Sequence, residues 1–144
     1  MHLYCLANVY TDHTNKYPSI TPNTIYKIME GHTPIRVRTM NEETGEQEFT
    51  QVIAVSHDYV PTRVIKGKYN RHTCCSDDTQ LLTKDGWKRA DQIAIGDKLK
   101  LGTGRYLIVQ SIQNDREYRS GFNFKLLRGT NIVTRNAIVR VDWV

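Results

Sequence analysis

Short stretches in which apolar and polar residues alternate recur along the chain, and this pattern most constrains the fold. Residues 35–40 alternate strictly, and the polar stretch 41–46 carries Gly45, which tolerates the positive φ that a hairpin turn requires. Residues 49–55 are predicted to form the returning strand. β-Branched and aromatic residues are abundant while alanine is scarce, which also favours strands over helices. The sequence therefore predicts an all-β protein.

Further strands and turns follow at short intervals toward the end of the chain. Residues 59–75 are predicted to form a hairpin that turns at 66–68, and a short strand is expected at 80–83. Residues 105–113 and 131–141 lack a clean alternation. We expect these two segments to be strands that are buried on both faces.

One helix interrupts this pattern near the start of the chain. Thr21 is a suitable N-cap, Pro22 follows at the first helical position, and Gly31 stands just beyond the expected end. Apolar residues between them recur at helical spacing and share one face. Residues 21–31 are therefore predicted to contain a short amphipathic helix.

The length and the cysteine content indicate a single reduced domain. A chain of 144 residues with 39% hydrophobic residues suits one core, so one domain over residues 1–144 is predicted. No basic segment precedes a long apolar run at the start, and no window of eighteen apolar residues occurs. Cys5, Cys74 and Cys75 make no disulfide framework. We expect a cytoplasmic protein without membrane contact.

The formal net charge of +5 and the pI near 9.2 suit an anionic partner such as nucleic acid. The basic residues are scattered, however, with no run of five or more and no interleaved aromatic residues. An ordinary solvated face accounts for them, and nucleic-acid binding stays an alternative that rests on net charge alone.

A metal site built from His72, Cys74 and Cys75, with His57 as a further ligand, is a second alternative. Adjacent residues of a strand point to opposite faces, and the chain has no Cys-x-x-Cys pair. We therefore expect no metal and no cofactor, and predict that one of the two adjacent thiols is buried and the other exposed.

Residues 75–99 resemble a conserved stretch of the Hint (hedgehog/intein) domain family. In that family a Thr-x-x-His block is followed by a short strand, an Asp-Gly-Trp turn, a helical turn that contains Ala, and a Gly-Asp pair. The matching residues occur in this order and spacing: Leu81-Leu82-Thr83, Gly86-Trp87, Ala90, Ile93 and Gly96-Asp97. Without the family, the same residues predict a short turn in which Trp87 is largely buried against Ala90 and Ile93.

Both ends of the chain extend this resemblance. Cys5-Leu6 is similar to the Cys-Leu with which many inteins begin, and residues 130–142 align without a gap on the family's closing pattern H-N-F-x-x-x-N-G-I-x-V-H-N. The resemblance implies a Hint-like horseshoe of short antiparallel strands with one or two short helices. It also implies that Cys5 and Asp142 approach each other at its centre, within about 15 Å, a few strand spacings.

Protein splicing in this family starts with an N-to-S acyl shift, in which a thiol attacks the preceding carbonyl. The resemblance places Cys5 as that nucleophile, Ser76 where the family has Thr, and Thr79 where it has His. Thr79 cannot titrate near neutral pH, so a general acid worth about 10²- to 10⁴-fold is missing. Asp78 precedes Thr79 and can carry a proton if it is buried.

The last splicing step is cyclisation of a terminal Asn that a penultimate His assists. Val141 and Asp142 occupy these two positions, and neither supplies the chemistry. Thr130 stands at a further assisting His, and Lys125 at the position of a strand Asp, an alignment that requires a gap. Most of the residues that splicing needs are therefore substituted.

The sequence leaves three hypotheses for function. In the first, the domain has kept the Hint scaffold, has lost splicing, and acts as a binding or regulatory module for a protein partner. In the second, it is an autoprocessing domain in which Cys5 still performs the acyl shift and releases an N-terminal peptide. In the third, it is a basic nucleic-acid-binding β domain.

Overall fold

The computed structural model describes residues 1–4, 7–12, 19–113 and 117–143. Its elements in chain order are β1 (Leu3–Tyr4), β2 (Val9–Tyr10), β3 (Ser19–Ile20), α1 (Pro22–Glu30), β4 (Arg36–Met40), β5 (Gln47–Lys66), β6 (His72–Ser76), β7 (Gln80–Thr83), β8 (Gly86–Arg89), β9 (Lys98–Lys100), β10 (Tyr106–Ile108), β11 (Ser111–Ile112), β12 (Glu117–Leu126), β13 (Asn131–Val133) and β14 (Ile138–Arg140). Strands dominate, as the sequence predicts. No helix within these residues is long and apolar enough to cross a membrane.

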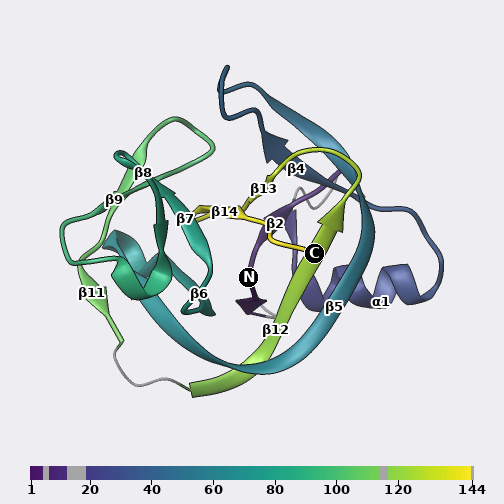
Figure 1. The fold of residues 1–144 in the computed structure, drawn as a ribbon, viewed down its shortest axis with the longest axis horizontal. Coiled ribbons are helices and arrows are strands. Elements are labelled where there is room, and N and C mark those ends of the chain that lie inside the picture. Colours follow the sequence, from purple (N-terminus) through teal and green to yellow (C-terminus); the bar gives the residue numbers. More distant parts are fainter. Residues whose placement is uncertain (5–6, 13–18, 114–116, 144) are drawn as a thin grey trace.

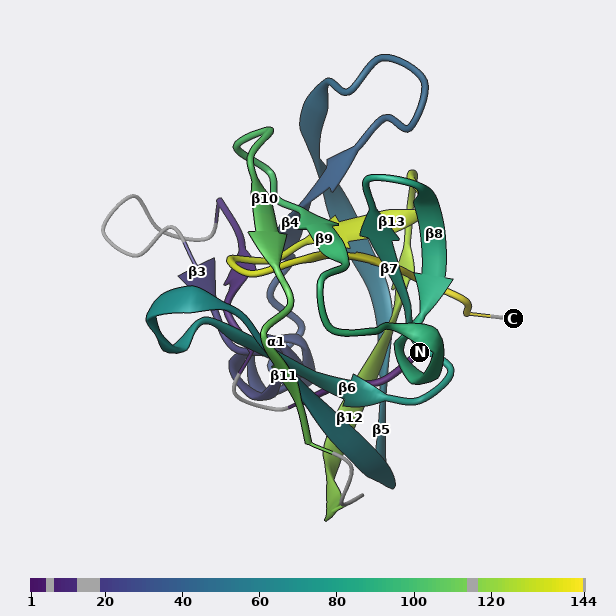
Figure 2. The same cartoon turned by 90° about the vertical axis from the view of Figure 1, so that its left-hand side faces the viewer.

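Most of the strands form two curled antiparallel sheets, and β2 and β3 form a separate two-stranded sheet. The first has the order β11-β5-β12-β1-β6, with β4 and β6 also pairing with β5. The second has the order β10-β9-β7-β14-β13, with β8 pairing with β7. In Figure 1, β5 and β12 sweep around the molecule as a curved ribbon, and both chain ends lie inside that curve. Figure 2 shows β7, β8 and β9 above β6. This arrangement is the predicted horseshoe.

The long strand β5 organises the first sheet. Its 20 residues run without interruption from the hairpin at Gly45, where φ is +76°, to Lys66. Its successive segments pair with β4, then β12, then β6. Near its end it also pairs with β11. The prediction of two separate strands here is therefore wrong, because one bent strand pairs with four neighbours. Pro61 lies within it, opposite Tyr118.

The helix is confirmed at its predicted bounds. The Thr21 side chain accepts a hydrogen bond from the Thr24 backbone N–H, and Pro22 stands at the first helical position. Gly31 ends α1, and its N–H donates to the Ile28 carbonyl at 3.1 Å. Ile25 is fully buried, so α1 covers one side of the horseshoe (Figure 1).

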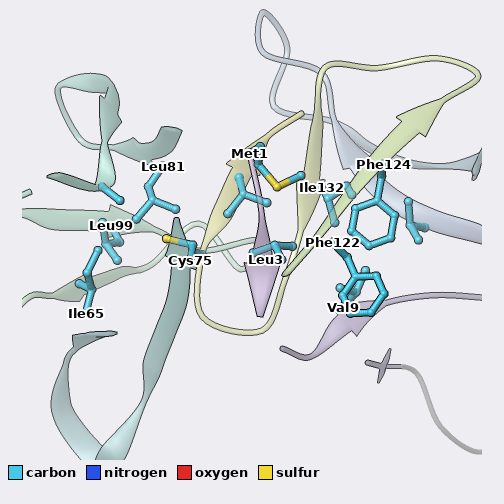
Figure 3. Close-up of a cluster of buried hydrophobic side chains, with 14 of the residues drawn as sticks. Met1, Leu3, Val9, Ile65, Cys75, Leu81, Leu99, Phe122, Phe124 and Ile132 are labelled. Atoms are coloured by element: carbon cyan, nitrogen blue, oxygen red, sulfur yellow. The ribbon is translucent and has the colours of Figure 1, made fainter. Parts of the chain in front are cut away.

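One large apolar core fills the space between the two sheets. Leu3, Phe122, Phe124 and Ile132 are its central members, each at most 2% exposed. Figure 3 shows that Met1, just before β1, and Leu3 on β1 lie between side chains from both sheets. Because β1 is flanked by β12 and β6, its residues are enclosed and the start of the chain is held at the centre.

Two segments expected to be buried on both faces differ from each other. Asn131–Val133 and the following strand β14 are indeed almost wholly buried, but they form a hairpin rather than one strand. In β10, Leu107 is buried whereas Tyr106 and Ile108 are 43% and 49% exposed. That expectation is wrong for 105–113, because β10 lies at the edge of the second sheet and only one of its faces is covered.

The Gly-Asp pair of the family-like segment makes a structural turn. Gly96 has a φ of +94°, and the Asp97 carboxylate accepts hydrogen bonds from the Ala94 N–H and the Lys88 ammonium, both at 2.8 Å. The hydrogen bond from Lys88 is the main reason that the pKa of Asp97 lies below its ordinary value. This turn leads the chain into β9.

Trp87 differs from the sequence-based prediction. Ala90 and Ile93 are buried in the large core, but Trp87 is only half-buried and packs with Met40, Val133 and Ile138 in a smaller cluster. Its indole N–H donates to Glu42 at 2.6 Å. Alternation along β8 turns Trp87 to the opposite side from the core.

We therefore expect Trp87→Ala to lower the free energy of unfolding by about 1–2 kcal/mol, well below the cost of emptying a core aromatic site. Urea denaturation monitored by circular dichroism measures this value. A loss above about 3 kcal/mol would show that the indole carries core packing after all.

Asn131 joins β13 to β4 through a buried amide. Its Oδ1 accepts from the Met40 N–H and its Nδ2 donates to the Met40 carbonyl, both at 2.8 Å, and the residue is fully buried. Asn131→Ala is expected to cost about 2–3 kcal/mol, because both Met40 groups lose their partner in the interior. Thr130→Ala, at the exposed neighbouring residue, is the control and should cost less than about 1 kcal/mol. Equal costs would contradict the role of the buried amide.

Candidate functional site

Both ends of the described chain meet in one cluster, defined here as Met1, Ser76, Asp78, Thr79 and Asp142 and called the central cluster. The Met1 nitrogen lies 2.6 and 2.8 Å from the two carboxylate oxygens of Asp142 and 3.4 Å from Asp78 Oδ2. The Met1 side chain is 1% exposed, whereas those of Asp78 and Asp142 are each 47% exposed. A buried amino group is thus held between two half-exposed carboxylates.

The turn after β6 positions three of these residues. The Thr79 N–H donates to the Ser76 carbonyl at 3.1 Å, which closes a tight turn over Asp77 and Asp78. Within this turn the Ser76 hydroxyl donates to Asp78 Oδ1 at 2.6 Å, and it lies 2.9 Å from the Thr79 hydroxyl. Because the Ser76 proton is directed to Asp78, Thr79 is the donor of the second bond.

The two hydroxyls hold the start of the chain. The His2 backbone N–H donates to Ser76 Oγ at 3.1 Å and to Thr79 Oγ1 at 3.2 Å, and the Ser76 N–H donates to the His2 carbonyl at 3.0 Å. Leu3 then pairs with Cys75 in the sheet. The hydroxyls thus hold the backbone that follows the Met1 amino group.

A glycine on β12 allows β1 to approach this closely. A Cβ atom on Gly121 would lie 2.8 Å from the His2 Cβ and 3.0 Å from Val60 Cγ2. Gly121 is opposite Tyr4 in the ladder between β12 and β1. Only a residue without a side chain fits between these neighbours.

Asp142 reaches the central cluster from the end of β14. The Val141 N–H donates to the Thr130 carbonyl at 2.9 Å, which extends the β13–β14 hairpin to its last residues. The Asn123 amide donates to Asp142 Oδ1 at 3.1 Å. Asn123, not the aligned Lys125, is thus the residue of β12 that contacts the cluster, and Lys125 is exposed.

The charges of the cluster shift two pKa values. Partial burial alone would raise the pKa of Asp78, but the hydrogen bond from Ser76 and the charge of the Met1 amino group outweigh it, so this pKa lies below its ordinary value of 3.8. Burial and the Met1 amino group lower the pKa of His2 from 6.5, against opposing effects of Asp78, Asp58 and Asp142. Asp78 is therefore ionised at neutral pH.

The lowered pKa of Asp78 predicts an acid-sensitive site. An acid whose pKa is lower in the folded than in the unfolded chain contributes stability above its unfolded pKa, and this contribution is lost as the pH falls through the folded pKa. When the pH is lowered below about 4, the urea concentration at the unfolding midpoint should therefore decrease more for the wild type than for Asp78→Asn. The variant has no carboxylate to protonate at this position. Identical pH profiles for both proteins would contradict the ion pair.

The structure brings together four of the five residues that the sequence singles out: Ser76, Asp78, Thr79 and Asp142. Cys5 lies outside the described residues. Sequence reasoning missed Met1, His2 and Asn123, whose roles depend on the register of β1 between β6 and β12. The contacts are made by the Met1 nitrogen, the His2 backbone N–H and the Asn123 side-chain amide. None of these groups belongs to a sequence motif by which it could have been found.

The two adjacent cysteines are both buried free thiols. Cys75 is fully buried and Cys74 is 5% exposed, so the prediction that one is exposed is wrong. β6 is covered on both faces, so alternation exposes neither thiol. Burial is the main reason that the pKa of Cys75 rises to about 12. This thiol is therefore not a nucleophile at neutral pH.

The metal alternative is also not supported by the geometry. His57 stacks on Phe122 with 4.8 Å between ring centroids, on the α1 side of the ribbon. Within the part of the chain that the structure describes, no three His, Cys, Asp or Glu side chains are arranged to hold a metal ion. His57, His72, Cys74 and Cys75 therefore do not form a site together.

Comparison with known proteins places this geometry in a structural class. No protein-family model matches the chain, and no curated protein matches it. Among solved structures, a DnaB intein from Synechocystis sp. PCC 6803 superposes with a TM-score of 0.80 at 17% identity, over 99% of both chains. A bacterial intein-like domain from Clostridium thermocellum gives 0.80 at 17% identity over 98% of both chains.

A DnaX mini intein from Spirulina platensis gives a TM-score of 0.74 at 19% identity, over 97% of this chain and 99% of that one. These proteins match along nearly their whole lengths, with the same curled antiparallel sheets and short helix content. At these identities the similarity establishes the fold. The chain therefore has the intein-like Hint fold.

Proposed function

We propose that this Hint-fold domain has lost protein splicing and serves as a binding module for another protein. The chemical composition of the central cluster carries the proposal. Two hydroxyls and two carboxylates surround the backbone of residues 1 and 2 there. Splicing instead needs a thiol or hydroxyl nucleophile, a proton-transferring imidazole and a terminal amide.

Residues of the central cluster make structural contacts and lack the groups that splicing uses. The Met1 side chain is a thioether, which cannot attack a carbonyl, and it is packed in the core. The Thr79 hydroxyl is buried and hydrogen-bonded to the start of β1. The Asp142 carboxylate is held in an ion pair. These contacts stabilise a closed site, which supports a scaffold role.

The proposal is tested on the full chain extended at both ends by short soluble segments. Overnight incubation with and without dithiothreitol, followed by intact-mass measurement, should return the single mass of the extended chain. Each missing proton-transfer group costs about 10²-fold or more, so cleavage should not reach a measurable level.

Two outcomes would contradict the proposal. A ligated product of the two added segments would show that splicing is retained. Release of the N-terminal segment on addition of dithiothreitol, abolished in Cys5→Ala, would show that the autoprocessing alternative at Cys5 is correct. A Cys74→Ala variant is the matched control, because this thiol is buried in β6.

A further inference from the structure

A cavity of about 290 Å³ lies between β1, β6 and the turn that joins β13 to β14. Two residues in its lining, Thr73 and Asn136, each carry a buried oxygen atom without a hydrogen-bond partner: Thr73 Oγ1 and Asn136 Oδ1. They are the only such side-chain atoms among the residues that the structure describes. Buried polar atoms without partners are uncommon in folded proteins, because each costs stability.

The surroundings of these atoms define what would satisfy them. The Asn136 Nδ2 donates to the His72 carbonyl at 3.0 Å, so its Oδ1 is left as an acceptor. Thr73 is 6% exposed, and its hydroxyl oxygen can also accept. Leu3 and Ala7 give the same cavity an apolar wall. A ligand with N–H groups and small apolar side chains therefore suits it.

A second cavity of about 360 Å³ is the neighbour of the first, because Tyr4, His72 and Cys74 line both. Lys66 and Arg119 also line the second cavity, and none of the described residues that line either cavity is an Asp or a Glu. Arg119 is already paired with Glu117 at 2.7 Å. Lys66 is exposed and takes part in none of the ion pairs of the described residues, so an anionic group is the complement of this cavity.

We propose that the two cavities along β6 bind a short acidic peptide segment of a protein partner. Backbone N–H groups of the peptide satisfy Thr73 and Asn136 in the first cavity, and a carboxylate side chain pairs with Lys66 in the second. This inference deepens the proposed binding role and rests on it. The mass experiment tests splicing and the titration below tests this site, so the two can fail separately.

The chemistry of the cavities favours a peptide over nucleic acid. A nucleic acid offers repeated phosphates and stacking bases, which require several cations and exposed aromatic faces. Among the described residues, the cavities offer two strong cations, one of them already paired, and only two rings, those of Tyr4 and His72. A peptide with alternating carboxylates supplies both of the groups that the cavities require.

The test is a titration of the ¹⁵N-labelled full chain with the peptide acetyl-Ala-Glu-Ala-Glu-amide, which is about 13 Å long when extended. Saturable chemical-shift changes are expected at Thr73, Cys74, Asn136 and Arg119, with a Kd of about 0.1–1 mM. Acetyl-Ala-Gln-Ala-Gln-amide should bind at least about fivefold more weakly. Added salt should weaken the acidic peptide more than the neutral one.

Two variants separate binding from folding. Lys66→Gln should weaken the acidic peptide about fivefold and leave the neutral peptide unchanged, whereas Lys125→Gln, at an exposed lysine outside both cavities, should change neither. Thr73→Val removes an unpartnered buried hydroxyl, so the melting temperature of this variant protein should equal or exceed that of the wild type. Its affinity for both peptides should nevertheless fall about fivefold.

Four results would overturn the proposal. The first two are the absence of a saturable change up to the solubility limit of the peptide, and changes confined to other surfaces. The third is a full response to sodium acetate or inorganic phosphate, which would indicate a general anion site. The fourth is a larger change at the same residues with an oligothymidylate than with the peptide.

Discussion

Combining Met1→Cys, Thr79→His, Val141→His and Asp142→Asn in the chain extended at both ends is expected to restore measurable cleavage at the two junctions. Each substitution returns a group that splicing requires, and each proton-transfer group is worth about 10²- to 10⁴-fold. The expected gain over the wild type is therefore at least about 10⁴-fold. Intact-mass measurement over time gives the rates directly.

We place the N-terminal junction at Met1, not at the aligned Cys5, because of the geometry of the central cluster. Its nitrogen lies 2.6 Å from Asp142, and the N–H of the following residue is held by Ser76 and Thr79. A thiol on residue 1 would lie next to the peptide bond that precedes it. A histidine at position 79 would approach the same backbone from the turn between β6 and β7.

Partial restorations serve as controls with distinct products. Met1→Cys with Thr79→His should allow only a thioester at residue 1, seen as release of the N-terminal segment by dithiothreitol. Val141→His with Asp142→Asn should allow only cleavage after residue 142. If Thr79→His alone releases the N-terminal segment as well as the pair does, the reactive thiol is Cys5. The assignment of Met1 to the junction would then be wrong.

Phe122→Ala is expected to lower the free energy of unfolding by about 3–5 kcal/mol, the range for emptying a buried aromatic site. Phe122 is 2% exposed, pairs with Leu3 across β1, and contacts the rings of His57 and Tyr26 at 4.8 and 5.7 Å between centroids. Its ring therefore joins the ribbon, the helix and the start of the chain. Urea denaturation measures the loss.

Tyr118→Ala is the matched control for this substitution. Tyr118 lies on the same strand but is 60% exposed, so its truncation should cost less than about 1 kcal/mol. Similar losses for both variants would show that β12 is stabilised by its ladder of hydrogen bonds and not by the core beneath Phe122.

Local chemistry determined much of this protein from its sequence. The N-cap at Thr21, the positive φ at Gly45 and the turn at Gly96-Asp97 all depend on residues close together in the chain, and each lies where predicted. The resemblance of segments 75–99 and 130–142 to the Hint family implied the horseshoe. Ser76, Asp78, Thr79 and Asp142 could be singled out because they stand in these two segments.

Tertiary structure alone decided how distant segments meet. Pairing with four neighbours makes β5 one continuous strand, and its sequence carries no mark of that pairing. Trp87 faces the smaller cluster because β8 pairs with β7 in one register. Met1 and Asn123 join the central cluster because β1 is held between β6 and β12. Short-range patterns determine turns, caps and alternation, whereas register depends on packing between residues far apart in the chain.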